Sequence, residues 1–126
     1  MGLPKTACVI TFIVTKDRKI AKDFYQDVLG FKVSSEDDFA LVFDLNGVVL
    51  RISTSESHVA LPYTVLGWEI LDIVAEVKNL REKKVEFIVY DGMGQDQYGI
   101  WTPPGGSTKV AWFKDPDGNV LSLTEF

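Results

Sequence analysis

The sequence predicts an α+β fold built from two tandem β-α-β-β-β modules within one domain. Segments rich in β-branched and aromatic residues are separated by polar turns, which is typical of strands. Two other segments have the apolar spacing of amphipathic helices, and the order strand, helix, strands occurs twice at similar length. The first module spans about residues 5–56, the connector 57–63 and the second module 64–126. A chain of 126 residues buries roughly two-thirds of its unfolded surface, which is enough for one core.

The first module begins with a strand at 7–14, followed by a helix whose two ends are marked. Asp17 suits the N-cap, and Gly30 suits a left-handed residue at the C-terminal end. Between them, apolar residues at i, i+4 and i+8 form one stripe: Ile20, Ala21, Phe24, Tyr25, Val28 and Leu29. We therefore expect this stripe, including Phe24 and Tyr25, to lie in the core.

Three strands are expected next, at about 31–35, 39–45 and 48–54. Asn46-Gly47 separates the last two and favours the positive φ angles of a type I′ hairpin turn. The polar stretch that follows is irregular and predicts a connector.

The second module repeats this order. A strand is predicted at 64–71, and Asp72 suits the N-cap of a helix that turns Ile73, Val77 and Leu80 inward. Further strands are expected at about 85–90, 98–102, 108–114 and 119–125, the last two joined by the turn Asp115-Pro-Asp-Gly118. Lys84 stands where a helix-ending glycine is expected, and a lysine in a left-handed conformation costs up to ~1 kcal/mol.

Composition and charge exclude several classes of function. The net charge of −5 repels phosphate backbones, so no nucleic-acid partner is expected. No apolar run approaches the roughly 18 residues of a membrane span, and no secretory signal is visible, so we expect a cytoplasmic protein that does not span a membrane. Cys8 is the only cysteine, which excludes an internal disulfide, and its apolar surroundings predict a buried, inert thiol.

Two stretches carry a resemblance to a known family. Asp17-Arg-Lys-Ile-Ala-Lys-Asp-Phe-Tyr-Gln-Asp-Val-Leu-Gly30 and Ala111-Trp-Phe-Lys-Asp-Pro-Asp-Gly-Asn-Val-Leu-Ser-Leu-Thr-Glu125 resemble the vicinal-oxygen-chelate superfamily. This superfamily includes glyoxalase I, the bleomycin- and fosfomycin-resistance proteins and the extradiol dioxygenases. The resemblance implies that each module curls into a half-barrel, that the helices cover one face of each sheet, and that the concave faces form a barrel-like cavity. It also implies a homodimer, because members of the family commonly pair.

The resemblance implies a divalent metal held by His and Glu side chains, one from each of four strands. The matching positions here are Ile10 (or Val9), Arg51, Val65 and Ser122. Aliphatic side chains offer no lone pair, arginine is a permanent cation and serine alone is a poor ligand, so we expect no metal and no cofactor. His58, the only histidine, lies in the polar connector and is expected to be a solvated loop residue.

Strand alternation predicts which side chains face the concave side. On the strands at 48–54 and 119–125 these are Val49, Arg51, Ser53, Val120, Ser122 and Thr124. On the strand at 64–71, Leu66, Trp68 and Ile70 form the helix-side row, which turns Glu69 toward the cavity.

Arg51, Glu69 and Ser122 are therefore candidate ligand-binding residues. Arg51 with Ser122 suits an anionic or carbonyl group, and Glu69 suits a general base or a group that recognises a donor on the ligand. The alternative is structural: Glu69 is then a strand-end carboxylate in water, or it pairs with Arg51 in a salt bridge.

The segment 91–106 combines glycines with Met93, Tyr98 and Trp101, a composition typical of a mobile lid that presents aromatic side chains to a ligand. Tyr98 and Trp101 are thus further candidate ligand-binding residues. The alternative is that both fill the core beside Trp112.

The resemblance and these residues together indicate a glyoxalase-related protein. The preferred function is metal-independent binding or sequestration of a small, partly apolar molecule, as in the bleomycin-resistance branch. The alternative is a lyase- or isomerase-type enzyme that uses Glu69 as a base, or a divalent metal held by non-standard ligands. A third possibility is a structural module whose own side chains fill the cavity.

Overall fold

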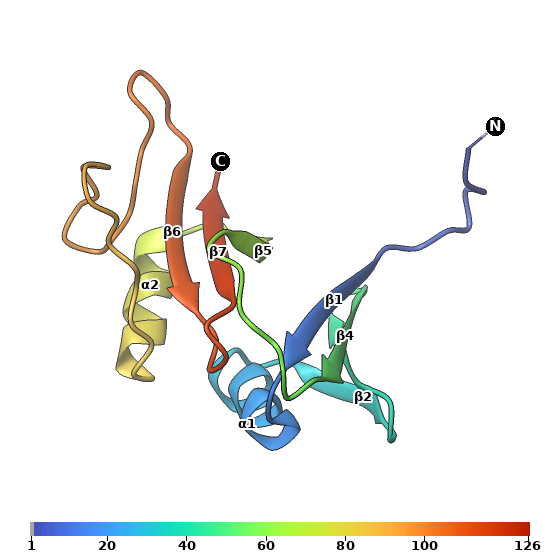
Figure 1. Cartoon of the computed structure of the whole chain (residues 1–126). Helices are drawn as coiled ribbons and strands as arrows, with labels where there is room; N and C mark the ends of the chain where they lie inside the picture. Colours follow the sequence, from blue (N-terminus) through green and yellow to red (C-terminus); the bar gives the residue numbers. More distant parts are fainter. Residues whose placement is uncertain (1) are drawn as a thin grey trace. The chain divides into compact units, whose positions relative to one another are not determined.

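The structure is a computed structural model that describes residues 2–126. It has the α+β architecture expected from the sequence, with one four-stranded and one three-stranded sheet (Figure 1). The elements, in chain order, are β1 (Ile10–Thr15), α1 (Arg18–Asp23), η1 (Phe24–Val28), β2 (Lys32–Glu36), β3 (Leu41–Leu45), β4 (Val48–Thr54), β5 (Thr64–Glu69), α2 (Ile73–Glu82), β6 (Lys109–Lys114) and β7 (Val120–Glu125). The chain divides into two compact units, unit 1 (Met1–His58) and unit 2 (Val59–Phe126).

Unit 1 contains a sheet in the order β1-β4-β3-β2, in which β1 runs parallel to β4 and the other pairs are antiparallel. Ala21 and Tyr25 are buried, and the Tyr25 ring lies 5.9 Å from the Phe43 ring, so α1 and η1 cover one face of this sheet. The opposite face, called here the open face of unit 1, exposes Phe12 and Arg51. The core of unit 1 therefore lies on the helix side of its sheet.

The first helix has the predicted ends, and Ile20 is the exception in the predicted apolar stripe. The Asp17 carboxylate accepts hydrogen bonds from the backbone N–H groups of Lys19 and Ile20, which confirms the N-cap, and Gly30 has a φ of 80°. From Phe24 the helix widens to a π-helical turn, closed by the bond from Leu29 N to Phe24 O at 3.0 Å. Ile20 is 51% exposed, so its inclusion in the core was wrong; it points about 100° away from Ala21 around the helix.

Two local backbone predictions are confirmed. Asn46 and Gly47 have φ angles of 55° and 95°, as a type I′ turn between β3 and β4 requires. Lys84 has a φ of 70° at the end of α2, where its N–H donates to the Arg81 carbonyl. A residue with a Cβ thus occupies a position that favours glycine.

Unit 2 contains a sheet in the order β5-β7-β6, in which β5 is parallel and β6 antiparallel to β7. Helix α2 packs on one face of this sheet through its buried residues Ile73, Val77 and Leu80, as predicted (Figure 1). The Asp72 carboxylate caps it by accepting from Ala75 N at 3.1 Å, and Glu125 Oε1 accepts from Ile73 N at 3.0 Å. The last residue of β7 is thereby joined to the first turn of α2.

The strands predicted at 85–90 and 98–102 are wrong. Each forms only a single bridge to β6, Phe87 to Phe113 and Trp101 to Val110. The chain leaves the edge of β6 after Ile88 and returns at Trp101, so no continuous ladder forms. This segment is gold to orange in Figure 1.

The structure also corrects the environment of Cys8. Its thiol is exposed, because β1 begins only at Ile10 and Cys8 lies before it. In the described part of the chain, no helix has the length and apolar character needed to cross a membrane.

Candidate functional site

The face of the unit 2 sheet opposite α2, called here the open face of unit 2, is built from residues that share rows across three strands. Gly67 of β5, Ser122 of β7 and Trp112 of β6 are direct neighbours in register and form one row. Ser122 is only 8% exposed. The row therefore combines a small, a polar and a large aromatic position.

A second row lies beside the first. Glu69, Thr124 and Val110 are in register across β5, β7 and β6, and Trp101 extends the row at the edge of β6. Trp101 N donates to Val110 O at 2.8 Å, and Val110 N donates to Trp101 O at 2.9 Å. The side chain of Glu69 is exposed, while Trp68 before it stacks on Phe113 at 6.5 Å on the helix side. Strand alternation thus turns Glu69 away from the side on which Trp68 lies.

Three aromatic residues gather at this face. The Trp112 ring lies 5.5 Å from the Tyr90 ring in an edge-to-face arrangement and 6.2 Å from the Trp101 ring. All three residues are half-buried, so the protein covers part of each side chain and solvent reaches the rest. We call Tyr90, Trp101 and Trp112 the aromatic cluster.

From the sequence, Trp112 was considered only as a core neighbour of Tyr98 and Trp101 in the structural alternative, and Tyr90 was given no role. The signal for Trp112 was available, since Ala111 and Phe113 on either side are buried on the helix side and alternation places Trp112 opposite. Tyr90 has no comparable signal, because it lies in an irregular segment.

Tyr98 does not join the aromatic cluster. Its ring lies beside α2, with Lys78 Nζ 5.5 Å and Arg81 Cζ 5.9 Å from its centre. Arg81 also donates to Gln97 O at 3.1 Å. Tyr98 is therefore held on the helix side of unit 2, unlike Trp101.

Arg51 belongs to unit 1, where it is exposed on the open face in register with Phe12 and Val42. The backbone N–H groups of Phe39 and Ala40 hold the pKa of the Asp37 carboxyl below its ordinary value, and the positive charge of Arg51 lowers that pKa further. Arg51 thus has an acidic neighbour within its own unit.

The positions matched to metal ligands do not fit a metal. Ile10 lies on the open face of unit 1, because Ile13 and Thr15 of β1 are the buried ones, and Val9 precedes the strand. Neither Ile10 nor Val65 offers a donor atom, and the Arg51 guanidinium repels cations. Across residues 2–126 the structure brings together no group of three or more His, Cys, Asp or Glu side chains that could bind an ion.

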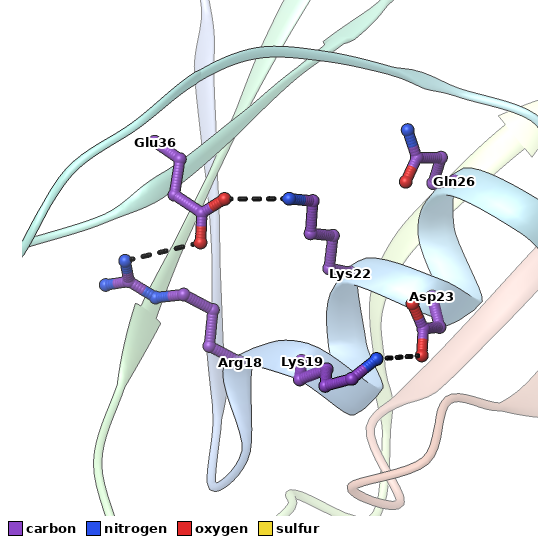
Figure 2. Close-up of a pocket in the computed structure, with 6 residues that line it drawn as sticks. All are labelled: Arg18, Lys19, Lys22, Asp23, Gln26 and Glu36. Atoms are coloured by element: carbon purple, nitrogen blue, oxygen red, sulfur yellow. Dashed lines mark hydrogen bonds and ion pairs between the residues drawn. The ribbon is translucent and has the colours of Figure 1, made fainter.

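A polar depression of about 570 Å³ lies on the helix side of unit 1 (Figure 2). Its lining residues are Arg18, Lys19, Lys22, Asp23, Gln26 and Glu36. Glu36 pairs with Lys22 at 2.9 Å and with Arg18 at 3.7 Å, and Lys19 pairs with Asp23 at 3.3 Å. The hydrogen bond from Lys22 is the main cause that lowers the pKa of Glu36. Its charges are mutually paired, so the depression serves to join α1 to β2 and is not the candidate site.

Comparisons with known proteins agree with this architecture. The family model described as the Glyoxalase/Bleomycin resistance protein/Dioxygenase superfamily matches residues 7–123. A superfamily member from Sphaerobacter thermophilus DSM 20745 superposes with a TM-score of 0.73 at 23% identity, covering 96% of this chain and 98% of that one. TnmS3, an antibiotic binding protein from Streptomyces sp. CB03234, superposes with a TM-score of 0.69 at 22% identity, covering 98% of each chain. A glyoxalase/bleomycin resistance protein/dioxygenase from Alicyclobacillus acidocaldarius gives 0.68 at 18% identity, covering 96% and 92%.

Proposed function

Because the chain belongs to the Glyoxalase/Bleomycin resistance protein/Dioxygenase superfamily, we propose that it binds a small, partly apolar molecule without a metal ion. The observation that carries this proposal is the aromatic cluster on the open face of unit 2. Half-buried aromatic rings bordered by a few polar groups are typical of small-molecule sites. Trp101 and Trp112 supply the apolar surface, and Ser122 and Glu69 supply the polar groups.

Charge favours a ligand with a cationic or hydrogen-bond-donating group near its aromatic part. Glu69 is exposed in the same row as Trp101, and a carboxylate accepts such groups. The net charge of −5 adds a general attraction for cations. We further propose that Arg51, on the open face of unit 1, recognises an anionic or carbonyl group.

Metal independence follows from the chemistry of the donor positions. Ile10 (or Val9), Arg51, Val65 and Ser122 stand where the family resemblance implies His and Glu. A binding function needs only a surface and no catalyst, and TnmS3, one of the similar structures, is itself described as an antibiotic binding protein.

The alternative is a lyase- or isomerase-type enzyme in which Glu69 acts as a base. Its support is that Glu69 is a carboxylate on the same face as the aromatic cluster. Water reaches this exposed side chain, which disfavours proton abstraction in a closed site. A ligand recovered chemically unchanged after incubation supports binding, and a change in its mass supports the enzyme.

We also propose that the protein acts as a homodimer. The support is the open face of unit 1, where Ile10 and its register partner Val49 are exposed together with Phe12. Native mass spectrometry of the freshly purified protein tests this, since it reports subunit number, bound ions and carried-over ligand together. A monomer at micromolar concentration contradicts the proposal.

The binding proposal is tested with proflavine, a planar aromatic cation, titrated in EDTA and followed by the polarisation of the dye. We expect saturable binding that zinc or nickel does not strengthen. Trp101→Ala should weaken it about tenfold or more, as loss of a central aromatic contact does. Trp68→Phe is the matched control, because Trp68 stacks on Phe113 on the helix side. Equal affinity in both variants, or binding only with added metal, contradicts the proposal.

A further inference from the structure

We propose that Gln95 is a positioning residue for the open face of unit 2. Its side-chain amide bridges the two legs of the segment that carries Tyr90 and Trp101 and so holds both rings beside Trp112. The inference deepens the proposed function, on which its relevance to ligand binding rests.

The segment between Ile88 and Trp101 departs from β6 and returns to it. Ile88 N donates to Trp112 O at 2.8 Å where the first leg leaves, and Trp101 N donates to Val110 O at 2.8 Å where the second leg arrives. Tyr90 lies on the first leg, just beyond the last backbone bond to β6. The backbone of Trp101 is held at β6 by its bonds with Val110, so the orientation of its ring and the position of the Tyr90 ring depend also on what joins the two legs.

Gln95 lies between the legs and bonds to both. Its Oε1 accepts from Tyr90 N at 2.7 Å, and its Nε2 donates to Ile88 O at 2.9 Å on the first leg. The same Nε2 donates to Gly99 O at 2.7 Å on the second leg. A primary amide has two donor hydrogens and an acceptor oxygen, and all are used here. Gln95 thus supplies the hydrogen bonds that a neighbouring strand would otherwise supply to the backbone of Ile88, Tyr90 and Gly99.

Among the described residues, the other hydrogen bonds of the segment lie within one leg, reach β6 or reach α2, and do not join the two legs. Gly92, Gly94 and Gly99 have φ angles of 80°, 71° and 76°. Glycine gives the unfolded chain many alternative backbone conformations, which raises the entropy lost when this segment becomes ordered. Asp96 Oδ1 accepts from Tyr98 N and Ile100 N, but these bonds close only the turn 96–100. The bridge between the legs comes from Gln95.

The chemistry of the bridge is specific to glutamine. Glutamate keeps the acceptor for Tyr90 N but has no donor for the Ile88 and Gly99 carbonyls. Methionine has a similar shape and neither function. Because Gln95 is partly buried, the backbone groups it serves lose their partner without full access to water.

A ligand-free measurement decides whether Gln95 positions the aromatic cluster. Indole rings as close as those of Trp101 and Trp112, 6.2 Å apart and inclined by 40°, couple excitonically and give a paired signal in circular dichroism. Trp101→Phe identifies that signal by removing it. We expect Gln95→Met to lose most of the signal and to speed amide exchange at Tyr90.

Gln97→Met is the matched control. It makes the same chemical change two residues further on, at an exposed residue. Arg81 donates to the backbone carbonyl of Gln97, and the Gln97 side chain takes no part in that bond. We expect it to keep the signal. If Gln95→Met does not fold, Gln95→Glu is measured in its place. Glutamate retains the acceptor for Tyr90 N and lacks the donors, so this variant should lose part of the Trp signal, and a full signal would overturn the inference.

Proflavine affinity separates this inference from the proposed function. Gln95→Met should weaken binding about tenfold, a loss equivalent to about 1.4 kcal/mol, while Gln97→Met should not. Loss of the Trp signal with unchanged affinity supports the positioning role and contradicts the cluster as the binding surface. A Trp signal in Gln95→Met equal to that of Gln97→Met overturns the inference, whatever the affinity.

Discussion

The hydroxyl of Ser122 occupies the space that a side chain at Gly67 would need. A Cβ placed on Gly67 would clash with Ser122 Oγ and would lie 3.3 Å from the Ser122 carbonyl oxygen. β5 and β7 therefore approach closely in this row because one partner has no side chain.

Gly67→Ala should accordingly destabilise unit 2. The hydroxyl must rotate away or the strands must separate, and overpacking of this kind costs about 1–3 kcal/mol. Urea unfolding measures the loss. The double variant Gly67→Ala with Ser122→Gly removes the clash and should recover part of it, and a double variant with purely additive losses contradicts this account.

Lys84→Gly should stabilise the end of α2. The left-handed conformation at Lys84, with a φ of 70°, strains a residue that has a Cβ, so glycine should gain up to ~1 kcal/mol in thermal or urea unfolding. Lys83→Gly is the control, because Lys83 has a φ of −90° and glycine gains nothing there. A gain of the same size at both positions would mean that the backbone conformation is not the cause.

The ion pairs of the polar depression should contribute to acid sensitivity. The Lys22 hydrogen bond and charge lower the folded-state pKa of Glu36 from its ordinary value of 4.5, so this contribution to stability is present above pH 4.5 and is lost as the pH falls through the folded pKa. NMR titration of the Glu36 carboxyl should show its pKa rising in Lys22→Met. Lys19→Met should leave it unchanged, because Lys19 pairs with Asp23; equal effects of the two variants contradict the assignment.

Arg51→Met and Glu69→Gln should each cost little stability, and Glu69→Gln should change ligand binding on unit 2. Both side chains are exposed in their own units, and exposed charges contribute at most about 1 kcal/mol. Glu69→Gln should weaken proflavine binding, while Glu76→Gln, an exposed change on α2, should not. A structural salt bridge between Arg51 and Glu69 predicts instead losses of ~3–5 kcal/mol for single variants and recovery in the double variant.

The purified protein should hold no stoichiometric zinc, nickel, manganese or iron. The reason is the donor set, in which aliphatic side chains and a guanidinium replace His and Glu. Elemental analysis together with native mass spectrometry checks this. One tightly held ion per subunit would overturn it and favour the enzyme.

The sequence alone determined the elements whose signals are local. The helix caps at Asp17 and Asp72 and the turn at Asn46-Gly47 involve only residues close by in sequence. They could therefore be predicted without any tertiary contact. Alternation along a strand likewise predicted that Glu69 turns away from the Trp68 side.

The tertiary structure alone decided the segment from Ile88 to Trp101. A segment without apolar periodicity does not encode its own path, so its two predicted strands became single bridges to β6, which comes later in the chain. Whether Tyr98 lies by α2 and Tyr90 by Trp112 depends on hydrogen bonds and ring contacts between distant residues. Local propensity says nothing about such partners, because their pairing exists only once β6, α2 and this segment have packed together.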